Sequence, residues 1–168
     1  MDFTLSQAAQ SRIAMSRMAA EGMMRPIARQ YDEEEHSDPW EFFNAMWDIS
    51  KGNRDATNMS GGGAKKNGNA RSEATLLACM QIEELAWGDA GLYLSIPNPG
   101  LGGAAVQAVG TAEQKQRYLG TFYDGKPKWA AMAITEPHFG SDSKQVATTA
   151  VRDGDEWVLN GTKIFCTA

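Results

Sequence analysis

The sequence predicts an α+β fold, in which a helical bundle is followed by the start of an antiparallel β domain. Through about residue 122, the apolar residues recur at the three- and four-residue spacing of helices. After Pro127, the pattern changes to short segments rich in β-branched and aromatic residues, which is typical of strands. We therefore expect a helical domain over residues 1–127 and the first strands of a β domain over residues 128–168.

The helical part begins with an apolar stripe and contains two clear helix starts. The stripe has the spacing of one helical face, in Ile13, Ala20, Met24 and Ile27. Pro26 falls inside it, so we expect a kink there. Residues 38–41 (Asp-Pro-Trp-Glu) and 111–114 (Thr-Ala-Glu-Gln) have the pattern of a capping box, which indicates a helix start. Residues 51–71 are rich in glycine and asparagine and lack periodicity, which predicts a long loop.

The segments after Pro127 with the composition of strands are 129–135, 147–152 and 156–159. Asn160-Gly161 separates the last of these from residues 162–165, so we expect a hairpin turn at Asn160-Gly161. The final residues then form a strand without a partner, which would leave an open sheet edge. We therefore expect the β domain to be incomplete and the sequence to be part of a longer protein.

Composition and charge argue against several functions. The net charge of −5 disfavours binding to nucleic acid, which requires a basic surface. No apolar run reaches the roughly 18 residues that span a bilayer, and the first residues lack the pattern of a signal peptide. Cys79 and Cys166 lie far apart without metal-ligand spacing. We expect both thiols to be buried and unpaired, no metal site, and a location in the reducing cytoplasm.

Residues 135–142 (Thr-Glu-Pro-His-Phe-Gly-Ser-Asp) are the most informative stretch for chemistry. Thr135 and Ser141 supply hydroxyl groups, and Gly140 allows the backbone to approach another group closely. Such a loop can hold an anion through backbone amides and hydroxyls rather than through cations. The alternative is a plain connection that is capped by a serine and an aspartate.

A second glycine-rich segment, residues 100–105 (Gly-Leu-Gly-Gly-Ala-Ala), satisfies the Gly-x-Gly-x-x-Ala pattern of dinucleotide-binding folds. That site would need a strand before the glycines and an acidic residue at the end of a second strand. Pro97 and Pro99 interrupt any preceding strand, and Asp124 follows a capped helix. We therefore expect these glycines to serve a close contact between two helices.

The sequence resembles the acyl-CoA dehydrogenase family. Two blocks carry most of the resemblance, residues 130–142 and residues 153–167 (Asp-Gly-Asp-Glu-Trp-Val-Leu-Asn-Gly-Thr-Lys-Ile-Phe-Cys-Thr). Residues 111–119 and 2–5 are also similar to the family. The likeness is weak over 51–71, where relatives usually carry a Pro-Glu-Glu-Tyr-Gly-Gly-like segment, so the preference for a fatty acyl or steroid chain stays open.

The resemblance implies that a set of residues binds FAD: Met132, Ala133, Ile134, Thr135, Gly140, Ser141, Phe165, Cys166 and Thr167. In such a site, Thr135 bonds the pyrimidine side of the flavin, and Ser141 reaches the pyrophosphate or the thioester arm of the substrate. Phe165 lies beside the isoalloxazine ring, and Thr167 bonds its N5 edge. Strand geometry supports the last pair independently, because residues two apart share one face of a sheet.

The implied reaction is the oxidation of an acyl-CoA to the trans-2-enoyl-CoA. In the family, a glutamate of the C-terminal helical domain removes the α proton, so we expect the base beyond residue 168 and assign no catalytic residue here, including Glu136. The resemblance also implies an electron-transfer flavoprotein as electron acceptor and a homo- or hetero-tetramer of related subunits. The alternative function is a non-catalytic subunit or remnant of the same fold, which contributes only flavin or CoA binding or assembly.

Overall fold

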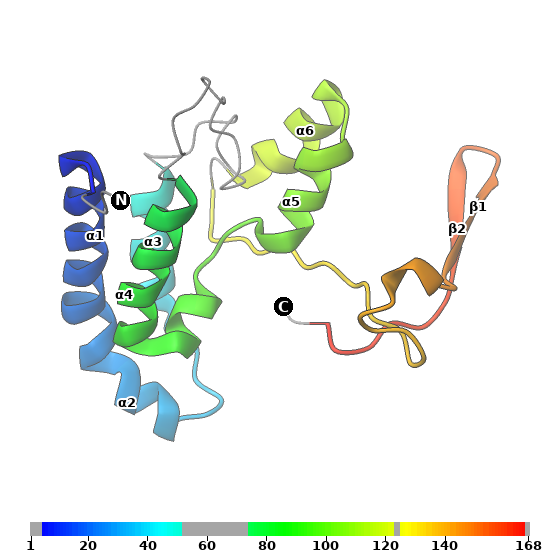
Figure 1. The fold of residues 1–168 in the computed structure, drawn as a ribbon. Coiled ribbons are helices and arrows are strands. Elements are labelled where there is room, and N and C mark those ends of the chain that lie inside the picture. Colours follow the sequence, from blue (N-terminus) through cyan, green and yellow to red (C-terminus); the bar gives the residue numbers. More distant parts are fainter. Residues whose placement is uncertain (1–4, 52–73, 123–124, 167–168) are drawn as a thin grey trace.

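The computed structural model describes residues 5–51, 74–122 and 125–166 of the chain (Figure 1). Helices occupy the described residues through Phe122, and an antiparallel two-stranded hairpin lies in the C-terminal region. The predicted α+β fold is therefore confirmed. The predicted loop over residues 51–71 lies outside the described residues except for Lys51, which ends a helix.

The first helical segment is interrupted by a turn of π-helix. Helix α1 (Gln7–Ala19) begins at Ser6, whose hydroxyl accepts a hydrogen bond from the Ala9 amide at 3.2 Å. The π-helix η1 (Ala20–Met24) follows, and helix α2 (Arg25–Glu33) then leaves the line of α1 (Figure 1). The expected bend is present, but the π turn explains it, because Pro26 lies in the first turn of α2, where its missing N–H costs nothing.

Four further helices complete the helical region: α3 (Trp40–Lys51), α4 (Ala74–Ser95), α5 (Gly100–Val109) and α6 (Ala112–Leu119), with a 3-10 turn η2 (Gly120–Phe122) after α6. The predicted starts of α3 and α6 are confirmed. At α6, the Thr111 hydroxyl accepts from the Gln114 amide, and the Gln114 side chain accepts from the Thr111 amide. Asp89 has extended backbone inside α4, and its carboxylate accepts from the Leu92 amide at 2.7 Å, so it restarts the last part of the helix.

The apolar core joins η1, α3 and α4. Its buried members are Ala20, Met24, Phe42, Phe43 and Leu92. Helix α4 and the π-helix η1 can approach closely because Gly88 of α4 lies against Ala20 of η1. A Cβ added at Gly88 would be 2.8 Å from the Ala20 Cβ. One helical turn after Phe43 in α3, Trp47 is 1% exposed, and its indole N–H donates to the Gly125 carbonyl at 2.8 Å. These contacts pack α3 and α4 against η1 and tie α3 to the chain at Gly125.

The hairpin consists of β1 (Thr149–Asp153) and β2 (Glu156–Asn160), with Val151 opposite Val158. Every residue of both strands is exposed, and the hairpin stands apart from the helices (Figure 1). The chain turns at Gly154, which has a φ of +60°, so the prediction of a turn at Asn160-Gly161 is wrong. Gly161 instead follows β2 and passes tightly against Thr148.

Residues 129–135 also differ from the prediction, because they form no regular strand. Among the described residues, one backbone–backbone hydrogen bond joins them to the later part of the chain, from the Ile164 amide to the Thr135 carbonyl at 2.9 Å. A ladder requires a series of such bonds between neighbouring segments. In the described chain, regular strands therefore begin at Thr149, later than the sequence pattern indicates.

Candidate functional site

An open cleft lies between the end of α4, the start of α5 and residues 129–135. Its volume is about 850 Å³. Most of its lining side chains are apolar: Met46, Leu85, Tyr93, Leu94, Ile96, Leu101, Trp129, Ala130, Ala131, Met132, Ile134 and Phe165, with Asn98, Gly100 and Thr135. The indole N–H of Trp129 donates to the Ser95 carbonyl at 2.8 Å, which ties residues 129–135 to the end of α4.

The glycine-rich start of α5 builds one wall of this cleft. A Cβ added at Gly102 would lie 2.6 Å from the Ala131 carbonyl oxygen, so only glycine permits this approach. The partner of Gly102 is thus the backbone of residues 130–131. The expected contact with a second helix is made by Gly103, where an added Cβ would lie 3.5 Å from the Leu119 side chain of α6. Within the described chain, no strand leads into Gly100, and α4 ends at Ser95, so the arrangement of a dinucleotide-binding fold is absent from these residues.

Several of the predicted flavin-binding residues meet at the cleft. Met132, Ile134 and Thr135 line it from one segment, and Phe165 lines it from another. Phe165 is 88% exposed and has a φ of 54°, a conformation that non-glycine residues seldom adopt. Its exposure and its place on the lining leave the ring available for a contact with a bound molecule.

Other predicted residues lie away from the lining. Ala133 and Cys166 flank lining residues, while Gly140 and Ser141 belong to an exposed loop. Thr167 lies outside the described residues. The assignment of all these residues to a flavin site therefore stays a prediction.

The prediction that both cysteines are buried is wrong. Cys79 and Cys166 are free thiols, and both are exposed. Cys79 shares an outward face of α4 with Glu83, which lies one helical turn further on and is also exposed. Cys166 is exposed beside Phe165, and its thiol donates to the Ile164 carbonyl at 3.6 Å. Small size and low polarity therefore did not decide the burial of either residue.

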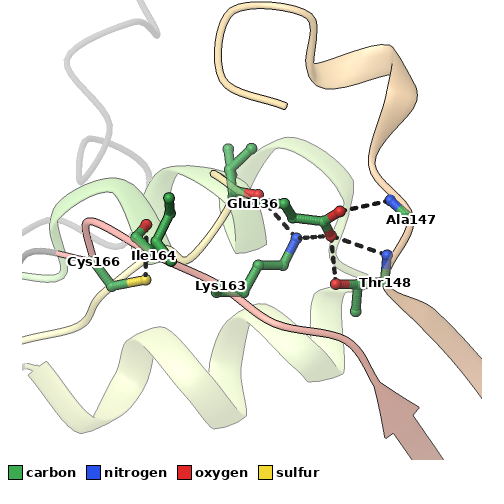
Figure 2. A network of polar contacts seen from close by, with 7 residues as sticks. Glu136, Ala147, Thr148, Lys163, Ile164 and Cys166 are labelled. Carbon is green, nitrogen blue, oxygen red and sulfur yellow. Dashed lines mark hydrogen bonds and ion pairs between the residues drawn. The ribbon is translucent and has the colours of Figure 1, made fainter. Parts of the chain in front are cut away.

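A polar junction that the sequence did not reveal is centred on Glu136, the residue after the lining residue Thr135 (Figure 2). The Glu136 carboxylate, 6% exposed, accepts from the Ala147 amide at 2.8 Å, the Thr148 amide at 2.9 Å and the Thr148 hydroxyl. Lys163 donates to the same carboxylate at 2.9 Å and to the Ile134 carbonyl at 2.9 Å. The junction joins three segments, and no spacing pattern connects a glutamate and a lysine 27 residues apart.

These donors favour the charged form of Glu136. The Thr148 hydroxyl, the Lys163 ammonium and the Ala147 amide lower the pKa of its carboxyl from 4.5 to about 2. A carboxylate with this pKa is a weak proton acceptor at neutral pH, and its oxygens are already engaged. Glu136 is therefore a structural anion and is unsuited to the role of a catalytic base.

The described residues contain no cluster of three or more histidine, cysteine or acidic side chains that could hold a metal ion. None of the helices in the described ranges combines the length and apolarity of a membrane span. Of the described side chains that line the cleft, none is a carboxylate. The cleft thus offers apolar surface, aromatic rings and a hydroxyl group.

Comparisons with known proteins identify the family of the chain. The family models for the N-terminal and middle domains of acyl-CoA dehydrogenases match residues 7–126 and 131–168. The chain is 35% identical to the short-chain specific acyl-CoA dehydrogenase of Clostridium acetobutylicum, over 99% of the chain and 42% of that protein. It is 30% identical to a probable mitochondrial medium-chain specific acyl-CoA dehydrogenase of Caenorhabditis briggsae, over 99% of the chain and 38% of that protein.

Among solved structures, the chain is similar to butyryl-CoA dehydrogenase from Megasphaera elsdenii, with a TM-score of 0.71 and 26% identity over 99% of the chain and 42% of that structure. The chain thus spans less than half the length of the relatives that it matches. The match of the N-terminal family model alone extends over more than half of the chain. The chain belongs to the acyl-CoA dehydrogenase family.

Proposed function

We propose that this chain supplies the flavin-facing wall of an enzyme that oxidises an acyl-CoA thioester to the trans-2-enoyl-CoA. The observation that carries the proposal is the meeting of Met132, Ile134 and Thr135 with Phe165 at one apolar cleft. Apolar clefts of about 300–1,000 Å³ with a few placed polar groups are typical of cofactor sites. Family membership supplies the reaction class.

The residues present fit FAD. The exposed ring of Phe165 can stack on a planar isoalloxazine, and the Thr135 hydroxyl can bond the edge of such a ring. FAD, when bound, supplies the acceptor for the hydride that leaves the β carbon of the substrate. We assign the flanking residues Ala133, Cys166 and Thr167 to the same ring system, and Gly140 and Ser141 to the pyrophosphate or the thioester arm.

The chain's own contribution is to orient the flavin. We propose that the base that removes the α proton comes from a glutamate of a C-terminal helical domain. The absence of a carboxylate among the described lining residues supports this, as does the low pKa of Glu136. We further propose a helical domain over 1–127 and a β domain from 128, an electron-transfer flavoprotein as electron acceptor, a tetramer of related subunits, and a reducing cytoplasmic location.

The test uses the protein purified from its native source. Its intact mass gives its length, its absorbance spectrum reports bound flavin, and a dye-reduction assay with a panel of acyl-CoAs reports turnover. We expect bound flavin and dye reduction with at least one acyl-CoA. Bound flavin without turnover on any acyl-CoA would favour the non-catalytic subunit. A native protein without flavin affinity would contradict the proposed enzyme and would leave only a subunit for CoA binding or assembly.

A matched pair of aromatic variants tests the site itself. Phe165→Ala removes an exposed ring that lines the cleft, whereas Trp157→Ala removes an exposed ring of the hairpin that does not. Loss of one aromatic stacking contact is expected to weaken flavin binding by roughly threefold to tenfold. Flavin fluorescence titration should show this loss for Phe165→Ala alone. Equal affinity of the two variants would remove Phe165 from the site.

A further inference from the structure

We propose that Lys163 and Glu136 are positioning residues that lock the two strips of the cleft wall at a fixed separation. The first strip is residues 131–135, and the second strip is residues 163–166. The lock is a property of the chain itself, and its effect on the flavin rests on the proposed function. Neither Lys163 nor Glu136 lines the cleft, so both act through their neighbours Thr135 and Phe165.

Lys163 holds both strips at once. Its ammonium group donates to the Ile134 carbonyl at 2.9 Å and to the Glu136 carboxylate at 2.9 Å (Figure 2). Both acceptors are adjacent to Thr135, and Lys163 itself lies two residues before Phe165. The only backbone bond between the strips that the described residues show runs from the Ile164 amide to the Thr135 carbonyl. The ammonium therefore supports the strips on both sides of that bond.

The burial of Glu136 indicates that its contact with Lys163 is decisive for the local structure. Among the described residues from 125 to 166, Glu136 alone is buried. The strips therefore have no apolar core of their own, and the hairpin beyond them is exposed on both faces. A buried carboxylate must be paired and hydrogen-bonded to be stable, so the loss of its cation destabilises the whole junction.

Glu136 extends the lock to the hairpin. Its carboxylate accepts from the amides of Ala147 and Thr148, immediately before β1. The chain between this point and Lys163 is the hairpin, so both ends of the hairpin are attached to the same carboxylate. Any displacement of the carboxylate would move Thr135 and the second strip relative to each other. Phe165 follows within two residues of that attachment.

The test compares Lys163→Met with Lys144→Met, in which an exposed lysine of the 3-10 turn η3 (Ser143–Gln145) is replaced. Hydrogen exchange is measured by mass spectrometry in peptides that contain Thr148 and Ile164, with α6 as an internal reference. Separately, FAD affinity and the visible circular dichroism of bound flavin are recorded in the native-length protein. Lys163→Arg serves as the conservative variant. If Lys163→Met loses its helical circular dichroism, the proposal is decided on Lys163→Arg instead.

We expect exchange at Thr148 and Ile164 to accelerate by about tenfold or more in Lys163→Met, because a hydrogen bond to a charged group is lost. FAD affinity should fall by a similar factor and the flavin dichroism should change, while Lys144→Met matches the wild type. Lys163→Arg should keep a measurable part of the protection.

Unchanged exchange at Ile164 would overturn the lock. Faster exchange with unchanged flavin affinity and dichroism would overturn its effect on the cofactor. A wild-type protein that binds no flavin would refute the proposed function, whereas the exchange measurements would still decide whether Lys163 and Glu136 hold the strips together.

Discussion

The helical region and the C-terminal region of the described chain are stabilised by different forces. In the helical region, Trp47 and Met24 are almost completely buried, and the rings of Trp40 and Phe43 pack edge to face. In the C-terminal region, every strand residue is exposed, and the buried Glu136 accepts hydrogen bonds from two other segments, residues 147–148 and Lys163. Burial of apolar surface is non-directional, whereas charged hydrogen bonds depend on geometry.

The cleft lies where these two regions meet, and the difference explains how it is built. The helices supply a wall of packed side chains, including Tyr93 and Leu101. Residues 131–135 and Phe165 supply the opposite wall, whose position depends on a few directional bonds. Substitutions in the core should therefore change global stability, and substitutions at the junction should change the local geometry of the cleft.

The largest expected effect on stability comes from removal of the Trp47 side chain. Trp47→Ala removes a ring that is 1% exposed, packs near Phe122 and donates to the Gly125 carbonyl. The free energy of unfolding should fall by about 3–5 kcal/mol. The matched control is Trp157→Ala, because Trp157 is 64% exposed on the hairpin, and we expect a change within about 0.5 kcal/mol. Denaturant titration followed by far-UV circular dichroism measures both, and similar losses would contradict the contrast between the regions.

A smaller effect is expected where α4 approaches η1. Gly88→Ala places a Cβ 2.8 Å from the Ala20 Cβ and 3.0 Å from its Cα, so one of the two helical elements must shift. Overpacking of this kind costs about 1–3 kcal/mol, partly offset by the better helix propensity of alanine, about 1 kcal/mol. Gly22→Ala is the control, because nothing lies within 4 Å of its Cβ position. Thermal unfolding should show a lower Tm for Gly88→Ala than for Gly22→Ala.

The difference between local signals and contacts made in three dimensions determines which features the sequence could predict. Helix starts are local, so the Thr111 capping box was readable from four residues. The hairpin turn was misplaced because Asp153-Gly154 and Asn160-Gly161 both carry the local signal of a hairpin turn, and the chain turns at Gly154. The exposed cysteines and the partner of Gly102 also depend on which surfaces meet in three dimensions, which composition does not specify.

The candidate site was predictable only in part. Family resemblance identified Thr135 and Phe165, and both line the cleft. The pairing of Glu136 with Lys163 was not predicted, because charged residues in loops are usually solvated and no periodicity relates the two positions. Residues that contact a cofactor are therefore easier to infer from a sequence than residues that support them from behind.

Lowering the pH is expected to have the smallest effect on global stability. This effect is also the most specific to the C-terminal region. The pKa of Glu136 in the folded chain is lowered from 4.5 to about 2, so folding favours the charged carboxylate. The stability that this charge contributes is fully present above the ordinary pKa and is lost as pH falls toward about 2. An NMR titration of the Glu136 carboxyl carbon and the Thr148 amide should show a midpoint at about pH 2.

Removal of the cation sharpens this prediction. In Lys163→Met, the carboxylate keeps its bonds from Thr148 and Ala147 but loses its ion pair, so the midpoint should rise toward the ordinary value without reaching it. In Lys144→Met, the midpoint should match that of the wild type. A wild-type midpoint near 4.5 would mean that the junction does not favour the charged carboxylate in solution. The C-terminal region would then need another source of order, because its described residues bury nothing else.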